Sequence, residues 1–447
     1  MPLTEALLDA LVSTAAATMI GGGGVGLYLT IAGAAGGAGQ VQTREDLCAH
    51  RYVRGATGCG KSTWLAHLFN AACEAGDGAW WISTHGGESM LDVIPEARVK
   101  DVVYLAPASD RPLGFNLFKR YTCEAIEANL IADQTTRLFE LLFERSWGDR
   151  IAEMVNAAAL ALVDWGEEAT LFELYRMLTD ERFRRRVLAG TQRLGVRDVL
   201  EADDKETKGV MARTAAKVRK SVTNSVLLTT LGQRNGLDLA ELVKRRAIVV
   251  TDLDSGKLGE HTARFLAETL VSKLQMVAMS RTGREKPVHL FCDEFQTYPV
   301  RAFATLLSEC RKKRMPVTLA HQEGEQLPKE LRGAVLQVGS KYWFRQTPPD
   351  AYMAVKDFPK GRHTAEDFVA LPNYTVIAKE LVRGRVVYSR FRTAPPAPAT
   401  GARDLVLGAS QGPSREAVLA EIAGRGTRDQ AEDDLEGLNL SGVVVRA

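Results

Sequence analysis

One segment, Gly55 to Ser62, has the spacing of a loop that binds phosphate groups. It reads Gly-Ala-Thr-Gly-Cys-Gly-Lys-Ser and fits the pattern G-x-x-x-x-G-K-[ST]. Glycines let such a loop fold so that backbone N–H groups point inward at the phosphates, while Lys61 reaches the β- and γ-phosphates and Ser62 ligates Mg²⁺. We therefore expect ATP and Mg²⁺ as ligands, with nucleotide contacts from Gly55, Thr57, Gly58, Cys59, Gly60, Lys61, Ser62 and Thr63.

Two adjacent carboxylates, Asp293 and Glu294, follow the mostly apolar run 288–292. The run predicts a buried strand, and α/β sheets place their ligands at the C-terminal ends of strands. Asp293 is expected to orient Mg²⁺, and Glu294 to polarise the attacking water as the general base. The alternative is a solvated Asp-Glu pair at a strand end. More than 200 residues separate the pair from the phosphate loop, so a large insertion must lie between them.

Strand-like and helix-like segments alternate around these residues and are expected to position them. Helices are expected at 63–69, 261–280 and 301–313. Strands are expected at 50–53, 78–84, 101–106, 246–252, 288–295, 316–320 and 341–345, with a hairpin at 374–381 and 385–391. This alternation predicts an α/β fold: a RecA-like P-loop NTPase core with a mostly parallel sheet covered on both faces.

Changes in composition divide the chain into four expected parts. The ATPase core is expected at 44–120 and 236–393. Residues 121–235 are expected to form an inserted all-α domain, because this segment lacks proline and its apolar residues recur at helical spacing. Residues 394–447 are expected to form a polar, partly disordered C-terminal tail with a short helix at 414–423 and an acidic run at 429–436.

The Gly/Ala-rich segment 1–43 has no charged residue from Ala10 to Thr43. It is long enough to cross a bilayer, but four successive glycines, Gly21 to Gly24, weaken a helix by roughly 1 kcal/mol each relative to alanine. No Lys or Arg precedes it, so it lacks the basic start of a signal peptide. Two interpretations stay open: a membrane-contacting segment, or a helix at 3–19 and a Gly-rich connector that packs on the core or a neighbouring subunit.

The overall composition excludes several classes of protein. Hydrophobic residues make up 45% and charged residues 25%, which excludes wholesale disorder. The net charge of +2 excludes a protein that binds nucleic acid simply by being polycationic, but it permits a local basic channel. The densest basic stretch of the insert either faces DNA or covers a helix face; it comprises Lys205, Lys208, Arg213, Lys217, Arg219 and Lys220.

The six cysteines are scattered and none forms a C-x-x-C pair. This pattern speaks against a zinc knuckle or a dithiol site. Scattered thiols in a chain of this size indicate a reducing, cytosolic compartment. We therefore expect a cytoplasmic protein. Whether it also associates with the inner membrane is left open.

Taken together, the motifs resemble the HerA–FtsK superfamily of hexameric DNA-pumping ATPases, and most closely the TraG-type conjugative DNA-transfer ATPases, the coupling proteins of type IV secretion. Asp293-Glu294-Phe295-Gln296 matches the family's Asp-Glu-Phe block, and Gly114-Phe115-Asn116-Leu117 is close to its Gly-Phe-Asn-Pro-Leu. Arg311-Lys312 and then Thr318-Leu319-Ala320-His321-Gln322 match its Arg-Lys and Gln motifs. The resemblance covers roughly 45–393.

The resemblance implies roles for two further residues. Gln322 would hydrogen-bond the γ-phosphate or the attacking water and report hydrolysis. Arg311 would be an arginine finger inserted in trans into the next subunit's site, where it stabilises the charge on the transferring phosphoryl group. The alternative for Arg311 is a solvated helix end favoured by the helix dipole, and Arg314 and Arg281 are lesser finger candidates. A finger in trans requires a closed ring, and the family implies six subunits.

The function implied by the resemblance is an ATP-dependent DNA translocase, a ring motor that moves DNA through a central pore in conjugative or type IV-like transfer. A viral genome-packaging motor and a HerA-like end-resection pump are alternatives, and a relaxase, a capsid protein or a nuclease as partner would distinguish the three. A secretion motor or adaptor that recognises protein substrates is an alternative of another class. A nucleotide-gated scaffold with little turnover is the third hypothesis, and the intact Lys61, Asp293, Glu294 and Gln322 argue against it.

Overall fold

The computed structural model describes residues 48–121, 125–143, 146–166, 169–298, 302–322, 329–409 and 412–426, with a few isolated positions besides. The chain divides into two compact units, Met1–Leu105 with Leu239–Ser410 and Ala106–Asp238 with Gln411–Ala447. We call them the sheet unit and the helical unit. The predicted N-terminal segment 1–43 lies outside the described residues, apart from the short strands β1 (Leu29–Thr30) and β2 (Val41–Gln42). Within the described part, none of the helices has the length and apolar character needed to span a membrane.

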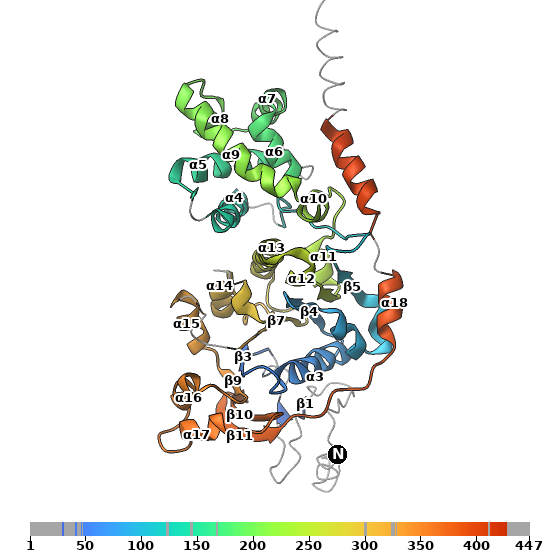
Figure 1. Cartoon of the computed structure of the whole chain (residues 1–447), viewed down its shortest axis with the longest axis vertical. Helices are drawn as coiled ribbons and strands as arrows, with labels where there is room; N and C mark the ends of the chain where they lie inside the picture. Colours follow the sequence, from blue (N-terminus) through green and yellow to red (C-terminus); the bar gives the residue numbers. More distant parts are fainter. Residues whose placement is uncertain are drawn as a thin grey trace, which may run out of the picture. The chain divides into compact units, whose positions relative to one another are not determined.

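Nine strands of the described residues form one sheet in the sheet unit, in the order β11-β10-β9-β3-β8-β7-β4-β6-β5 (Figure 1). All neighbours from β9 to β5 are parallel, whereas β10 runs antiparallel to both β9 and β11. The predicted mostly parallel α/β sheet of a P-loop NTPase is confirmed. The strands are β3 (Arg51–Arg54), β4 (Gly78–Ser83), β5 (Val102–Leu105), β6 (Ile248–Thr251), β7 (Val288–Asp293), β8 (Val317–His321), β9 (Ser340–Trp343), β10 (Thr375–Val382) and β11 (Arg385–Arg392).

The central strands are buried along their whole length, as expected for a parallel sheet covered on both faces. Helix α3 (Lys61–Glu74) begins directly after the phosphate loop and packs on β4 and β7. Its fully buried Phe69 ring makes edge-to-face contacts with Trp81 of β4 and Phe291 of β7, with centroids 6.0 and 5.5 Å apart. This aromatic packing holds the middle of α3 against β4 and β7.

The remaining elements of the sheet unit connect and cover the strands. Helix α13 (Glu260–Ser280) agrees with the prediction for 261–280. The prediction of a helix to residue 313 is wrong, because α14 (Ala302–Glu309) ends earlier and residues 310–314 form a turn. Further elements are η1 (Glu88–Val93), η2 (Glu96–Asp101), α11 (Leu239–Lys244), α12 (Ser255–Leu258), η4 (Phe295–Thr297), α15 (Lys329–Leu336), α16 (Pro348–Val355), α17 (Ala365–Val369) and α18 (Ala402–Ala409).

The helical unit contains only helices as regular elements within its described residues, which agrees with the inserted all-α domain. Helix α5 packs against α4, α6, α7, α8 and α9. Helix α6 starts with a capping box in which Thr170 and Glu173 satisfy each other's free backbone N–H groups. The helices are α4 (Ala125–Leu142), α5 (Asp149–Trp165), α6 (Leu171–Thr179), α7 (Glu181–Gly190), α8 (Val196–Glu201), α9 (Lys205–Thr223) and α10 (Ser225–Leu231).

The described part of the segment after 393 contains α18, which was not expected, and a helix at 415–426, which agrees with the helix expected at 414–423. Helix α18 packs on η1 and η2 in the sheet unit, and Thr400 Oγ1 donates to the Ile94 carbonyl at 2.8 Å. A helix at 415–426 belongs instead to the helical unit, where Arg425 is 5% exposed and donates to Glu173 at 3.1 Å. A buried charge needs a fixed partner, which ties this helix to α6. The acidic run 429–436 lies outside the described residues.

A buried histidine at the amino edge of the sheet makes stability depend on pH. His50 is 6% exposed, and its Nδ1 accepts a hydrogen bond from the Val317 backbone N–H at 3.0 Å. Burial, with smaller effects from the charges of Arg311 and Arg51, lowers the pKa of His50 to about 4. The native state therefore resists protonation in a range where the unfolded chain, with an ordinary histidine pKa near ~6.5, already takes up the proton.

We expect the free energy of unfolding to fall as the pH is lowered from ~6.5 to about 4, and His50 to cause no further loss below that range. The loss attributable to this group approaches roughly 3 kcal/mol. Urea unfolding at several pH values measures it, and His50→Gln should flatten the curve in this interval. The exposed His261→Gln is the matched control. An equal pH dependence in wild type and His50→Gln would contradict the assignment.

Candidate nucleotide-binding and hydrolysis site

Three neighbouring strands bring the residues predicted to bind and hydrolyse nucleotide to one edge of the sheet. Strand β8 lies between β3 and β7, and all three run parallel. The phosphate loop follows β3, Gln322 follows β8, and Asp293 with Glu294 ends β7. Parallel strands expose their carboxyl ends at the same edge, so residues that lie far apart in sequence meet there.

The phosphate loop has the backbone conformation that its glycines permit. Gly58 and Gly60 have φ angles of 72° and 100°, in the left-handed region that favours glycine. A side chain at Gly60 would also clash, because its Cβ would lie 2.5 Å from the Tyr374 ring. The Ala56 backbone N–H donates to the Arg345 carbonyl at 2.9 Å, and the Tyr374 N–H donates to the Cys59 carbonyl at 2.7 Å. Residues at the carboxyl end of β9 and the start of β10 therefore hold the loop in shape.

The loop ends at the N-terminus of α3, where free backbone N–H groups favour an anion. Thr57, Gly58 and Ser62 are exposed, Gly60 and Thr63 are partly exposed, and Cys59 and Gly55 are buried. The buried Cys59 thiol lies against Gly55, since a Cβ there would be 2.7 Å from Sγ. Cys59 thus fills space under the loop and offers a ligand only its backbone.

Lys61 and Glu294 form a buried ion pair in the sheet unit. The distance from Lys61 Nζ to Glu294 Oε1 is 2.8 Å, and the two residues are 5% and 6% exposed. Gln322 Nε2 also donates to Glu294 Oε1 at 2.7 Å, and Gln322 Oε1 accepts from Thr57 Oγ1 at 2.6 Å. Four predicted site residues therefore belong to one hydrogen-bonded network that crosses the phosphate loop.

The two carboxylates of the site differ in their electrostatics. Burial raises the pKa of Asp293 to about 6, with the Lys61 charge opposing and the Glu294 charge adding to the shift. Burial would also raise the pKa of Glu294, but the charge of Lys61 and the hydrogen bonds donated to this carboxylate outweigh it and lower the pKa below its ordinary value. Glu294 is therefore the more firmly ionised carboxylate in this arrangement, and it becomes a stronger proton acceptor only when the Lys61 charge moves away from it.

Asp293 and Ser62 offer the oxygen ligands that Mg²⁺ prefers. Ser62 Oγ lies 3.5 Å from Asp293 Oδ2 at the start of α3. Among the described residues, no group of three or more His, Cys, Asp and Glu side chains is arranged to hold a metal by itself. Mg²⁺ is usually held by one or two carboxylates together with substrate phosphates and water, so this donor set fits Mg²⁺ bound with a nucleotide.

Arg311 lies away from the phosphate loop of its own chain. It is exposed in the turn 310–314, which precedes β8 and therefore lies at the amino edge of the sheet. Its charge acts on the pKa of His50, which directly precedes β3 at that same edge. The structure thus brings Lys61, Glu294 and Gln322 together and leaves Arg311 out of that group.

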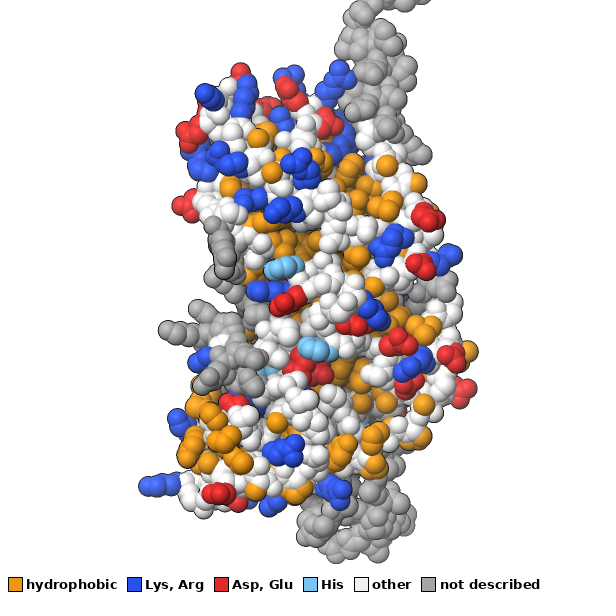
Figure 2. Space-filling model, in the orientation of Figure 1, with side chains coloured by type: hydrophobic (Ala, Val, Ile, Leu, Met, Phe, Trp, Pro, Cys, Tyr) orange, Lys and Arg blue, Asp and Glu red, His pale blue; other side chains and the backbone are white. Residues whose placement is uncertain are grey.

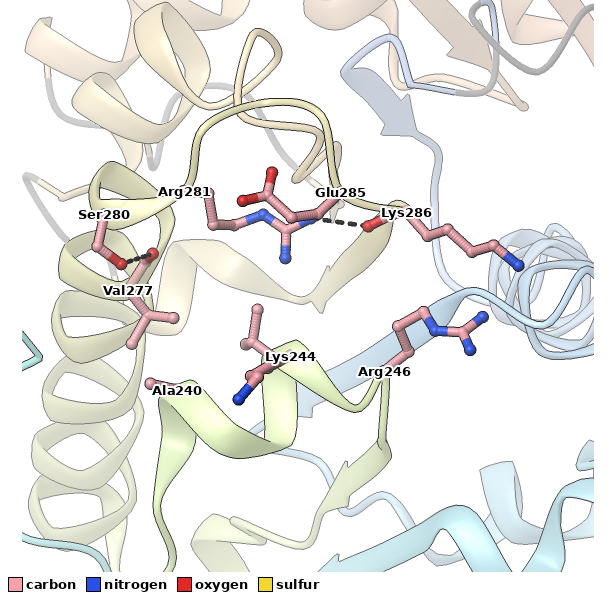
Figure 3. A pocket seen from close by; sticks show the side chains of 9 residues that line it. Ala240, Lys244, Arg246, Val277, Ser280, Arg281, Glu285 and Lys286 are labelled. Atoms are coloured by element: carbon pink, nitrogen blue, oxygen red, sulfur yellow. Dashed lines mark hydrogen bonds between the residues drawn. The ribbon is translucent and has the colours of Figure 1, made fainter.

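The lesser candidate Arg281 has a structural role. Its side chain is 7% exposed, and Nε and Nη2 donate to the carbonyls of Lys313 and Lys286 at 2.8 and 2.7 Å. It lines a cavity of about 350 Å³ beside the ends of α11 and α13 (Figure 3). Arg314, the other lesser candidate, has a φ angle of 53° and closes the turn before β8. Arg311 is therefore the exposed arginine among the three.

Sequence reasoning missed two residues that contact the site. Gln296 donates to Glu294 Oε2 at 2.7 Å. It stands in the motif Asp293-Glu294-Phe295-Gln296, so its position two residues after the general-base candidate was the available signal. Tyr374 packs on the phosphate loop from a distant part of the chain, and no local pattern marks it.

Comparison with known proteins identifies solved structures that share the fold of this chain. No protein-family model matches the chain, and no curated protein matches it in sequence. Solved structures with the same fold do exist. The plasmid coupling protein TrwB in complex with the GTP analogue GDPNP matches with a TM-score of 0.60 and 16% identity, over 90% of this chain and 95% of that one.

A second TrwB structure, in complex with ADP and Mg²⁺, matches with a TM-score of 0.59 and 16% identity over 90% of this chain and 94% of that one. VirB4 of Thermoanaerobacter pseudethanolicus matches with a TM-score of 0.55 and 14% identity over 77% of this chain and 90% of that one. The sheet unit and the inserted helices thus have the P-loop NTPase fold of these proteins. The particular fold is that of the conjugative coupling protein TrwB, which confirms at the level of fold the resemblance that the motifs indicated.

Proposed function

We propose that this chain is a Mg²⁺-dependent ATPase that moves DNA as a ring motor in conjugative or type IV-like transfer. The observation that carries the proposal is the network of Lys61, Glu294 and Gln322 across the phosphate loop. The network supports the chemistry, and the fold of the plasmid coupling protein TrwB, which has been solved with a nucleotide and Mg²⁺, supports the biological setting.

The mechanism follows from the positions of these side chains. The phosphates of ATP lie on the loop and on the start of α3, where Lys61 exchanges its bond to Glu294 for the β- and γ-phosphate oxygens. Asp293 and Ser62 would hold Mg²⁺, and the ion would supply positive charge beside the phosphates. Glu294, released from Lys61, accepts a proton from water as the water oxygen bonds to the γ-phosphorus and the bond to the β-phosphate oxygen breaks. The hydrogen bond between Gln322 and Thr57 responds to whether the γ-phosphate is present or has been cleaved, so Gln322 can report hydrolysis.

The proposed ring supplies the residue that each chain's own site lacks. Because Arg311 is exposed at the opposite edge of its sheet, it is available for the site of a neighbouring subunit. A head-to-tail interface that closes forms such a ring, and we propose six subunits. We also propose that the ring works in the cytoplasm, with DNA and a transfer partner such as a relaxase.

The helical unit offers cations for DNA phosphates. Helix α9 carries the basic stretch found in the sequence, and Lys and Arg side chains are numerous over the helical unit on the face seen in Figure 2. Lys217 is partly exposed, whereas Arg213 and Lys220 are exposed; the ammonium groups of Lys217 and Lys220 lie 5.1 and 5.4 Å from the centre of the Phe143 ring. Arg213 and Lys220 are seven residues apart and share a helix face. We propose this pair as phosphate contacts, which give affinity with little sequence preference.

DNA is expected to accelerate ATP hydrolysis by the full chain, and the acceleration should weaken as salt rises. Phosphate release with and without single- or double-stranded DNA measures this. The double variant Arg213→Gln and Lys220→Gln should need more DNA for the same stimulation, whereas the control Lys356→Gln and Lys360→Gln, exposed cations of the sheet unit, should behave as wild type. Equal ATPase rates with and without DNA would contradict the DNA motor and favour a motor or adaptor for protein substrates.

A further inference from the structure

The turn after β7 holds Glu294 in an uncommon backbone conformation. Glu294 has a φ angle of 48° and a ψ angle of 43°, the left-handed region that non-glycine residues rarely adopt. Its carbonyl accepts hydrogen bonds from the Thr297 N–H at 3.0 Å and the Thr297 hydroxyl at 2.8 Å. The Thr297 hydroxyl is also 2.6 Å from that of Thr84, at the end of β4. Fully buried Tyr298 ties the turn to the Ile82 carbonyl at 2.9 Å. The turn that carries Glu294 is therefore anchored to two strands.

Gln296 lies in this anchored turn, in the short helix η4. Its Nε2 donates to Glu294 Oε2 at 2.7 Å. Its own Oε1 is buried and has no hydrogen-bond partner among the residues that the structure describes. A buried unsatisfied oxygen costs about 1–3 kcal/mol, and a leucine of similar size would fill this space without that cost. The bond to Glu294 is therefore the specific contribution of a glutamine here.

The donors to Glu294 fall into two groups. Lys61 and Gln322 both bond to Oε1, the oxygen that faces the phosphate loop, whereas Gln296 is the donor to Oε2 among the described residues. A bound triphosphate competes for Lys61, since its oxygens are strong charge-assisted acceptors. The bond from Gln296 has no such competitor, because it joins two residues of the same anchored turn. Loss of the Lys61 bond removes the charged donor from Oε1 and leaves it with the Gln322 bond, while Oε2 stays held by Gln296.

We propose that Gln296 is a positioning residue for Glu294: it holds Oε2 so that Oε1 stays turned toward the phosphate loop when nucleotide takes Lys61 away. This inference rests on the proposed ATPase function and deepens it. Without the Gln296 bond, the released carboxylate rotates about its side-chain torsions and spends less time in the geometry that accepts the water proton. Gln296 makes no contact with the phosphate loop in the described hydrogen bonds, so ATP binding does not depend on it.

The test is Gln296→Leu in the full chain. We expect kcat for ATP hydrolysis to fall by about tenfold to hundredfold, the size of effect that misplacing a catalytic group produces. The Kd for ATP should stay unchanged. Affinity for ADP with aluminium fluoride, which imitates the transferring phosphoryl group with its attacking water, should fall in parallel with kcat. Gln337→Leu, at an exposed glutamine of the sheet unit, is the matched control and should change none of these quantities.

Each other outcome overturns the inference. An unchanged kcat in Gln296→Leu shows that Glu294 needs no such support. Equal losses of affinity for ATP and for ADP with aluminium fluoride, with a lower unfolding temperature, show a merely structural glutamine. A wild-type chain that hydrolyses no ATP removes the proposed function and this inference with it, whereas an active wild type beside an equally active Gln296→Leu removes the inference alone.

Discussion

Glu294→Gln is expected to bind ATP and to hydrolyse it about 10²–10⁴-fold more slowly than wild type, the contribution usual for a general base. Glutamine has the same shape as glutamate, and its oxygen can still accept hydrogen bonds from Lys61 or Gln322. It cannot take a proton from water at neutral pH. Because Lys61 and the loop are unchanged, the nucleotide keeps its contacts. Steady-state phosphate release gives the rate, and calorimetric titration with ATP gives the affinity.

The exposed Glu366, changed to glutamine in the same way, is the control and should hydrolyse ATP at the wild-type rate. Turnover retained in Glu294→Gln would remove Glu294 from the role of base. A variant that loses ATP binding together with turnover would instead show that the chief contribution of Glu294 is to hold Lys61 in the apo site, through the 2.8 Å ion pair.

Arg311→Ala is expected to lower ATP turnover by about 10³-fold or more, the range found for arginine fingers that act from a neighbouring subunit. The residue is exposed at the amino edge of the sheet, while its own phosphate loop lies at the carboxyl edge, so the proposed role requires the site of a neighbouring subunit. Mixing Arg311→Ala with inactive Lys61→Ala should restore part of the activity. In a mixed ring, some interfaces combine the intact Lys61 of one subunit with the intact Arg311 of the next.

Lys312→Ala, one position along the same exposed turn, separates a finger from a general need for positive charge there. It should keep the wild-type rate. If Arg311→Ala and Lys312→Ala slow the reaction equally, the turn acts as a solvated cationic surface. Absence of recovered activity at every mixing ratio would speak against a finger in trans.

The residues at the carboxyl edge of the sheet were predictable because each lies in a short sequence motif whose residue types are required by its chemistry. The loop needs glycines and Lys61 at fixed spacing, and Asp293-Glu294 follows an apolar strand. The hydrogen bond between Thr57 and Gln322 was not predictable, since it depends on the strand order β3-β8-β7. Register and order are properties of the whole sheet, and a local pattern does not contain them.

Boundaries failed where tertiary packing outweighs local propensity. The sequence before residue 314 favours a helix, because Arg and Lys are good helix formers. The chain nevertheless turns at Arg314 to enter β8. Pro316 was the available signal, as the residue before a proline avoids helical conformation. The sequence placed the polar helix 415–426 in a C-terminal tail. The buried ion pair of Arg425 and Glu173, which ties this helix to α6, joins residues far apart in sequence and leaves no local pattern.

The clamp on the phosphate loop sets an order of events during protein synthesis. Tyr374, whose ring closes on Gly60, is encoded more than 300 residues after the loop that it holds. At ordinary translation rates this gap corresponds to on the order of tens of seconds. A growing chain thus carries the complete phosphate-loop motif before the residue that packs on it exists. The contacts of Tyr374 with Gly60 and Cys59 form only after β10 has been made, late in the synthesis of the chain.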